Sequence, residues 1–313
     1  MNTRYAFRAE ALTREFAGGV RALDNLTLEV PAGIVFGFLG PNGAGKTTTI
    51  RLLLGLLEPT SGTAEVLGHD VRTAGERVRE QTGALLEHHG LYERLSAYDN
   101  LYFYARVARL PRADARARVR ELLERFGLWD RREDAAGTWS RGMKQKLAIA
   151  RALVHQPQLV FLDEPTAGLD PIAAATLRNE LAALAEQTGT SIFLTTHNLA
   201  EAERLCAHIG VVSRGRLIAH GHPDALRAAR GGEQIEIVGR SLEAGTTLLA
   251  NVRSVRSATM RNGRLVVQLE RGASAAPIVA TLVQGGAEIE EVRRDAASLE
   301  DVFMSLIEEP GVE

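Results

Sequence analysis

The sequence predicts an α/β fold with a mostly parallel sheet, followed by a smaller α+β domain. The first sign is an alternation of short apolar runs, typical of buried strands, with longer stretches of helical spacing. The second is a glycine-rich turn between one such run and a helix. The third is a change in the sequence pattern near residue 230, after which short strand-like pieces and two helices are expected. The length of 313 residues also favours two domains over one.

The predicted central strands are the apolar runs at 34–39, 159–162, 191–195 and 209–213. Apolar side chains at nearly every position suit strands covered on both faces, and strands that alternate with helices usually run parallel. Residues 26–30 instead alternate apolar and polar side chains, as a half-exposed strand does. The first helix carries the apolar stripe Ile50, Leu53, Leu54 and Leu57.

A helix-rich insert is expected at about 88–157, between two of the predicted strands. The first domain is predicted to end at residues 230–232, an Arg-Gly-Gly sequence, which gives domains at 1–230 and 234–313. The second domain is mildly acidic, with 8 Arg against 12 Asp and Glu. Residues 298–301 have the pattern of a capping box, which predicts a helix start there. Further helices are predicted at 112–126, 142–154 and 172–186.

Composition and charge exclude several classes of protein. The net charge of −2 argues against a nucleic-acid-binding domain, which is normally basic. No apolar stretch approaches the roughly 18 residues of a membrane helix, and the N-terminal residues lack the apolar core of a secretory signal. The single cysteine, Cys206, excludes an internal disulfide and fits a reducing cytoplasm; helical spacing of its neighbours predicts a packed core thiol.

Residues 40–47, Gly-Pro-Asn-Gly-Ala-Gly-Lys-Thr, fit the phosphate-loop pattern G-x-x-x-x-G-K-[ST]. They follow an apolar strand and open a helix, which is the setting of a P-loop NTPase core. Backbone N–H groups of such a loop turn toward phosphate oxygens, Lys46 adds a compact positive charge, and Thr47 offers a hydroxyl to Mg²⁺. The alternative is a glycine-rich turn that carries a lysine by chance. The predicted ATP-binding residues of this segment are Gly40, Pro41, Asn42, Gly43, Ala44, Gly45, Lys46, Thr47 and Thr48.

Two acidic residues, Asp163 and Glu164, follow the apolar run at 159–162. Successive side chains of a strand point to opposite faces, so the two carboxylates are expected to have different roles. Asp163 suits the shell of a metal ion, and Glu164 suits polarisation of an attacking water, a contribution of about 10²–10⁴-fold in rate. The alternative is a pair of solvated acids at a strand end.

With these motifs in this order, residues 4–230 resemble the ATP-binding subunit of an ABC transporter. Residues 139–143, Trp-Ser-Arg-Gly-Met, resemble the family signature, and residues 166–170 resemble its D-loop. His197 matches the switch histidine, which implies γ-phosphate sensing in catalysis, and Phe16 matches the aromatic residue that stacks on adenine. A polar residue at a strand end and a core phenylalanine are the respective alternatives.

The resemblance implies a head-to-tail pair of cassettes with ATP between the phosphate loop of one and the signature of the other. Ser140 and Gly142 lie at a predicted helix N-terminus, a natural site for the γ-phosphate, and Asp170 ends the D-loop. One phosphate loop and one signature occur in the chain, so a second copy or a related subunit is required. The resemblance also implies ATP and Mg²⁺ as cofactors and a separate transmembrane permease as partner.

Two positions depart from the family pattern. Glu87 replaces the usual Gln, which keeps an oxygen for Mg²⁺ or its water but adds a negative charge near the phosphates. In the signature, Arg141 and Met143 replace the usual Gly and Gln. The adjacent His88 and His89 have no third ligand nearby, so a metal site there is not expected.

The segment from 234 resembles the C-terminal extension of drug- and antibiotic-export ATPases, chiefly through residues 298–303. This favours export over import and a regulatory or dimer-supporting role for the extension; a small stabilising domain is the alternative. The chain is expected at the cytoplasmic face of the membrane, with apolar and aromatic residues between 87 and 104 meeting the permease or packing within the insert. The other function considered is a soluble ABC-type ATPase of translation or DNA repair. A GTPase is excluded because no Asn-Lys dipeptide occurs.

Overall fold

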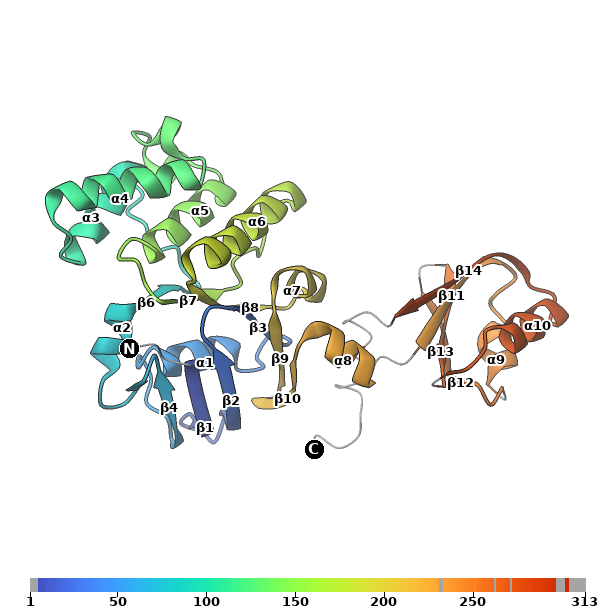
Figure 1. Cartoon of the computed structure of the whole chain (residues 1–313). Helices are drawn as coiled ribbons and strands as arrows, with labels where there is room; N and C mark the ends of the chain where they lie inside the picture. The colour runs from blue at the N-terminus through green and yellow to red at the C-terminus, as the bar shows by residue number, and fades with distance from the viewer. Residues whose placement is uncertain are drawn as a thin grey trace. The chain divides into compact units, whose positions relative to one another are not determined.

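The computed structural model describes residues 5–230, 233–250, 252–261, 263–270, 272–296 and 302–303. The chain forms two compact units, Met1–His220 and Gly221–Glu313 (Figure 1). The predicted capping box at 298–301 lies outside the described residues. Within the described residues, no helix is both long and apolar enough to cross a lipid bilayer.

The first unit is built on a six-stranded sheet with the order β10-β9-β3-β8-β7-β6. The pairs β3–β8, β3–β9, β7–β8 and β6–β7 are all parallel, which confirms the predicted fold class. Every residue of β3, β7 and β8 is buried, because helices and a second sheet cover this sheet. The strands are β3 (Val35–Leu39), β6 (Thr82–Leu85), β7 (Leu159–Asp163), β8 (Ser191–Thr196), β9 (His208–Ser213) and β10 (Arg216–Gly221).

A second, antiparallel sheet with the order β2-β1-β4-β5 packs against the first. Phe7 of this sheet lies edge-on to Phe193 of β8, with ring centroids 5.5 Å apart, and Phe36 of β3 stacks on Phe193 at 5.6 Å. Aromatic pairs of this kind contribute about 0.5–1.5 kcal/mol each beyond their buried area. The strands are β1 (Tyr5–Glu15), β2 (Arg21–Pro31), β4 (Ser61–Val66) and β5 (His69–Asp70).

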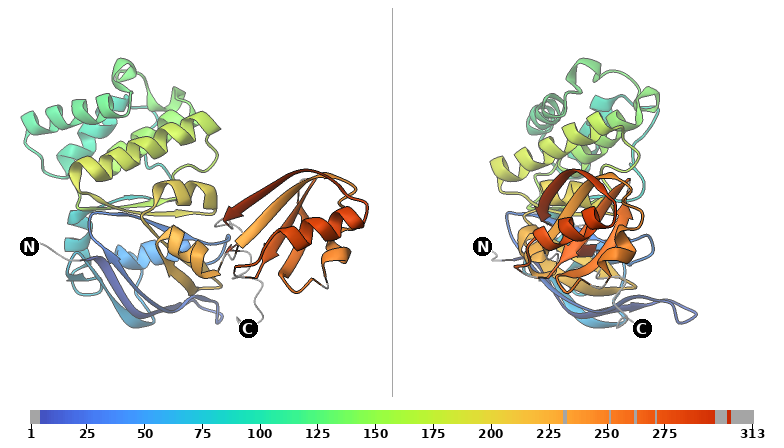
Figure 2. Two further views of the ribbon diagram at one scale, coloured as in Figure 1. Left: turned by 45° about the vertical axis from the view of Figure 1, so that its right-hand side comes forward. Right: turned by 90° about the vertical axis from the view of Figure 1, so that its right-hand side faces the viewer.

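Helix α1 (Lys46–Leu53) contacts strands of both sheets, so it is buried between them. The insert between β6 and β7 is helical, as the sequence predicts, and its helices gather with α6 on one side of the central sheet (Figure 2). Two short 3₁₀ turns, Trp129–Arg131 and Ala136–Thr138, connect its later parts. The remaining helices of this unit are α2 (Gly75–Gln81), α3 (Ala97–Val107), α4 (Arg112–Arg125), α5 (Arg141–Ala152), α6 (Pro171–Thr188) and α7 (Leu199–Leu205).

Cys206 follows α7 directly and is buried, which confirms the predicted core thiol. Burial raises the pKa of this thiol to about 12. The thiol therefore stays protonated and acts as a small apolar group.

The second unit begins with helix α8 (Pro223–Arg230) and contains an antiparallel sheet with the order β12-β13-β11-β14. Helix α10 packs on one face of this sheet through Ile278 and Leu282, opposite Ile235 and Val267. All four of these side chains are fully buried, so this unit has its own small core. The elements are β11 (Glu233–Arg240), α9 (Gly245–Leu249), β12 (Val255–Arg261), β13 (Arg264–Leu269), α10 (Ala276–Gln284) and β14 (Glu288–Ala296).

Candidate functional site

The phosphate-loop segment forms a tight turn from the end of β3 to the start of α1. Gly45 has φ +102, and a Cβ atom there would lie 2.3 Å from the carbonyl oxygen of Ala22. A Cβ atom on Gly40 would lie equally close to the carbonyl oxygen of Val212. Only glycine fits at these two positions, so the spacing of the pattern is a steric requirement of this turn.

Lys46 is the first residue of α1 and is almost fully buried, with 7% of its surface exposed. Its ammonium donates to the carbonyl oxygens of Gly40 at 2.7 Å and Pro41 at 3.3 Å. It also lies 3.2 Å from Oε1 of Glu164. The cation is therefore aimed into the turn of the loop rather than into solvent, and one carboxylate neutralises it.

Asp163, at the end of β7, accepts a hydroxyl on each oxygen. Thr47 donates to Oδ2 at 2.7 Å, and Thr195 donates to Oδ1 at 2.5 Å. Thr195 is also the pairing partner of Asp163 on the neighbouring strand β8. The sheet register therefore fixes this carboxylate, and Asp163 joins the phosphate-loop helix to the sheet edge.

Glu164 leaves the strand in a left-handed conformation, with φ +50. Its backbone N–H donates to the Oγ1 and the carbonyl oxygen of Thr195, at 3.0 and 3.2 Å. Its Oε2 lies 2.9 Å from Nδ1 of His197. For a residue other than glycine such a backbone costs on the order of 1–2 kcal/mol, and conformations of this type gather at functional sites. Asp163 and Glu164 thus have separate partners.

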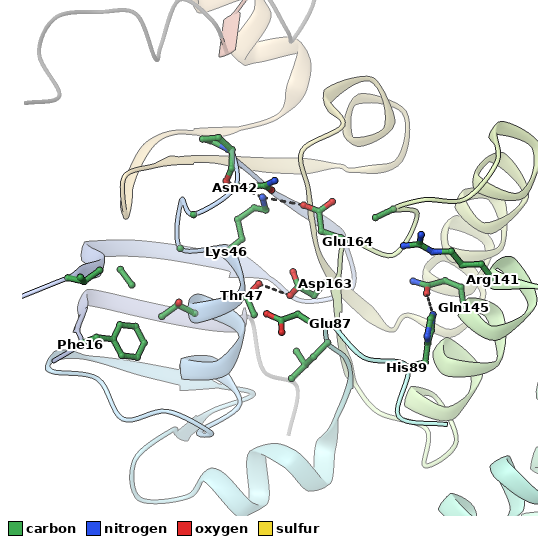
Figure 3. Close-up of a pocket in the computed structure, with 18 residues that line it drawn as sticks. Phe16, Asn42, Lys46, Thr47, Glu87, His89, Arg141, Gln145, Asp163 and Glu164 are labelled. Carbon is green, nitrogen blue, oxygen red and sulfur yellow. Dashed lines mark hydrogen bonds and ion pairs between the residues drawn. The ribbon is translucent and has the colours of Figure 1, made fainter. Parts of the chain in front are cut away.

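Lys46, Thr47, Asp163 and Glu164 line a cavity of about 540 Å³ (Figure 3). Phe16 lies on one side of the cavity and is 39% exposed, so it is not a core residue. Glu87 also borders the cavity and forms an ion pair of 3.4 Å with Arg51. Of the predicted residues, those that line the cavity are Phe16, Pro41, Asn42, Gly43, Gly45, Lys46, Thr47, Thr48, Glu87, Asp163 and Glu164.

The residues predicted to meet the γ-phosphate from the signature and D-loop do not line this cavity. Ser140 is the exposed N-cap of α5, and its Oγ accepts from the backbone N–H of Met143 at 3.3 Å. Asp170 is the exposed N-cap of α6 and accepts from the backbone N–H groups of Ile172 and Ala173. Four other predicted residues also do not line the cavity: Gly40, Ala44, Gly142 and His197.

Three further polar residues of the cavity were not predicted to contact it: Arg141, Gln145 and His89. Gln145 donates to the carbonyl oxygen of Pro165 at 2.7 Å and bonds through Oε1 to Nε2 of His89 at 2.8 Å. The first bond joins the insert to the chain just after Glu164, and the second lies within the insert. The sequence held a signal for Gln145, because this polar residue lies on the helix face that continues with the apolar residues Ala148 and Ile149. A polar residue on such a face indicates a specific partner. His89 thus has a protein partner, and within the described residues no cluster of three metal-ligating side chains forms.

Comparisons with known proteins agree with this geometry. The family model described as ABC transporter matches residues 23–167, and the model described as the C-terminal domain of ATP-binding protein DrrA1-3 matches residues 221–307. The second match confirms the predicted resemblance of the C-terminal region. Among solved structures, cbiO1 from Clostridium perfringens aligns with a TM-score of 0.68 and 27% identity, over 80% of this chain and 96% of that one.

Two curated relatives align over nearly the full length. The daunorubicin resistance ATP-binding protein DrrA3 of Streptomyces coeruleorubidus is 40% identical, over 92% of both chains. The bacitracin transport ATP-binding protein BcrA of Bacillus licheniformis is 33% identical, over 93% of this chain and 94% of the relative. These matches support a transporter ATPase over a soluble ATPase of translation or DNA repair. The chain belongs to the ATP-binding proteins of ABC transporters, and it is an ATPase.

Proposed function

We propose that this chain hydrolyses ATP to drive export of drugs, antibiotics or other amphipathic compounds through a separate transmembrane permease at the cytoplasmic face of the membrane. The names of the relatives support export: daunorubicin resistance for one and bacitracin transport for another. The match to the ABC transporter family model and the transport function of BcrA support a membrane partner.

In this proposal the triphosphate binds in the cavity of about 540 Å³, along the turn at 40–45. The burial of Lys46 supports its role as the phosphate cation, because the protein already supplies the desolvated site in which a charge acts most strongly. The exposed ring of Phe16, at the cavity edge, supports stacking on adenine, a contact worth about 1–3 kcal/mol in nucleic-acid systems.

Mg²⁺ fits the oxygen groups of this cavity. Thr47 and Asp163 bring a hydroxyl and a carboxylate within 2.7 Å of each other, next to the phosphate loop. Mg²⁺ prefers such oxygen ligands and is normally bound by one or two carboxylates together with water and substrate phosphates. Glu87 borders the same cavity and is proposed as a further contact to the ion or its water. When bound, the ion neutralises charge on the phosphates.

Glu164 is proposed as the general base that takes a proton from the attacking water. Its Oε2 lies 2.9 Å from His197, and its Oε1 lies 3.2 Å from Lys46, so the carboxylate stands between the phosphate-binding cation and the switch histidine. This position is the observation that carries the proposed hydrolysis, because a base must lie beside the group that it helps water to attack.

We further propose that the complete site needs a second cassette, either a copy of this chain or a related subunit. Ser140 and Asp170 cap exposed helix N-termini outside the chain's own cavity. A helix N-terminus attracts anions through its backbone N–H groups and its dipole, and that of α5 is the one offered here for the γ-phosphate. Ser140 and Gly142 at this terminus would contact the γ-phosphate held by the partner's phosphate loop, and Asp170, whose carboxylate caps α6, would lie beside it.

The proposed surface for the permease is the beginning of the insert. Tyr92, Leu95 and Phe103 are each more than one third exposed, and the rings of Tyr92 and Phe103 meet edge-on at 5.2 Å. Leu101, in contrast, is fully buried within the insert. An exposed aromatic group of this kind suits a protein contact.

The proposal is tested with the purified Glu164→Gln chain, which is expected to bind ATP, to hydrolyse it very slowly and to double in mass by light scattering when ATP is added. Adding Ser140→Ala to this chain should leave ATP binding intact and prevent the doubling. A monomer that binds ATP with full affinity would argue against pairing of identical copies and would direct the search to a related subunit.

A further inference from the structure

Glu201, in the first turn of α7, connects three parts of the first unit. Its Oε2 accepts the hydroxyl of Thr166 at 2.5 Å, and its Oε1 pairs with the guanidinium of Arg178 at 2.6 Å. Thr166 belongs to the D-loop and Arg178 to α6. The side chains of Arg178 and Glu201 are only 16% and 14% exposed. The Thr166 contact is a charge-assisted hydrogen bond, which is the stronger kind, and it is partly shielded from water.

These contacts close a ring that contains the proposed base. Glu164 contacts His197 at 2.9 Å, and the next residue, Asn198, accepts from the backbone N–H of Glu201 at 3.2 Å. The carboxylate of Glu201 then reaches Thr166, which lies two residues after Glu164. Starting at Glu164, the ring thus runs through the switch histidine and the first turn of α7 and returns to the D-loop.

Polar contacts connect the members of this ring. A cavity of about 410 Å³ lies beside the ring. The cavity shares Glu164 and Ala167 with the nucleotide cavity, which places the ring directly behind the site of hydrolysis. Its polar lining includes Thr166, Arg178, His197, Asn198, Glu201 and Arg204.

We propose that Glu201 is a positioning residue for ATP hydrolysis, which acts through Thr166. By bonding to Thr166, it sets the distance between Glu164 and His197 and the path of the D-loop between the two cavities. Arg178 in turn fixes the carboxylate of Glu201, as a third group orients the base in other hydrolytic sites. The inference rests on the proposed roles of Glu164 and His197. Neither Glu201 nor Thr166 lines the nucleotide cavity, so loss of their contact should lower the rate of turnover and leave the affinity for ATP unchanged.

The test compares two substitutions of similar size at Thr166. Thr166→Val keeps the shape and removes the hydroxyl, whereas Thr166→Ser keeps the hydroxyl. We expect Thr166→Val to lower kcat about tenfold with an unchanged KM for ATP, because small displacements of catalytic groups reduce rates strongly. Thr166→Ser should restore at least half of the wild-type kcat. A matched control is Thr281→Val, which removes a helix-surface hydroxyl of α10 that bonds to the carbonyl oxygen of Pro277; its kcat should equal that of the wild type.

A double-mutant cycle separates positioning from general damage. Glu201→Ala alone should lower kcat, and the combination with Thr166→Val should be no slower than the slower single variant, because both remove the same contact. Circular dichroism and ATP affinity verify that each variant is folded. Wild-type kcat in Thr166→Val, a matching rise in KM, or multiplied losses in the double variant would each overturn the inference.

The outcomes also distinguish this inference from the proposed function. If Glu164→Gln abolishes turnover while Thr166→Val does not change it, the base assignment stands and the positioning role of Glu201 is wrong. If Glu164→Gln keeps full turnover, the proposed base is wrong and the positioning role falls with it.

Discussion

Oε1 of Glu164 lies 3.2 Å from Nζ of Lys46, although the strands that precede these two residues, β7 and β3, are separated by β8 in the sheet. The contact joins the proposed base to the cation of the phosphate loop. The negative charge of Glu164 therefore weakens the attraction that Lys46 exerts on a triphosphate. Glu164 is only 24% exposed, so solvent screens this effect in part only.

From this contact we predict that Glu164→Gln strengthens ATP binding as well as slowing hydrolysis. Removal of the carboxylate charge leaves the full charge of Lys46 for the phosphates and removes a repulsion from them. Isothermal titration calorimetry should show a lower Kd for ATP, by about threefold or more, while turnover falls about 10²–10⁴-fold. Asp24→Asn is a suitable control, because Asp24 is paired with Arg216 outside the cavity. Weaker binding by Glu164→Gln would contradict the charge argument.

Glu87 offers a milder electrostatic test. Its side chain is 57% exposed and its partner Arg51 is 3.4 Å away, so its charge is well screened at the cavity edge. Glu87→Gln should therefore strengthen the binding of ATP without Mg²⁺ by a few fold at most. With Mg²⁺ present, the variant should need more of the ion for half-maximal turnover, because an amide oxygen is a poorer ligand than a carboxylate. An unchanged Mg²⁺ dependence would remove Glu87 from the proposed metal contacts.

The steric requirement at Gly45 predicts a large loss of stability. Gly45→Ala would bring a methyl group to 2.3 Å from the carbonyl oxygen of Ala22, and φ +102 is strained for alanine in any case. We expect a loss of several kcal/mol in the free energy of unfolding, measured with urea. Gly18→Ala is the matched control: it also has positive φ, +89, but no atom lies within 4 Å of its Cβ position, so only the backbone cost of about 1–2 kcal/mol applies. Equal losses in both variants would exclude the collision with Ala22 as the cause.

His155 gives a prediction on pH. Burial lowers the pKa of its imidazole from the usual 6.5, the cation of Arg118 lowers it further, and a hydrogen bond of 3.0 Å with the carbonyl oxygen of Thr82 opposes this. As pH falls below 6.5, the unfolded chain binds the proton first, so this contribution to stability is present at neutral pH and is lost on acidification.

His155→Gln keeps a donor for Thr82 but does not titrate. The difference between its urea midpoints at pH 7.5 and 5.5 should be smaller than the difference in the wild-type chain. Identical differences would show that His155 does not contribute to the acid sensitivity.

The sequence predicted the glycine-rich turn between β3 and α1 correctly because the whole motif is local. The loop, its strand and its helix occupy one continuous segment, so the glycine spacing carries the steric information within a few residues. The central strands were predictable for a related reason: β3, β7 and β8 are buried at every position, and such strands appear in the sequence as apolar runs. The long strand β1 was not predicted, because its buried and exposed residues do not alternate regularly.

The sequence by itself determined which residue types are available for phosphate binding and hydrolysis, and that they follow strands whose ends meet at one edge of a parallel sheet. Only the tertiary structure decided which of them touch. Lys46 and Glu164 are far apart in the chain, as are Thr166 and Glu201, and no local pattern encodes such pairs. Strand order and register bring them together, because the free energy of burying the whole sheet selects one arrangement of strands, and each side chain at the edge then takes the neighbours which that arrangement provides.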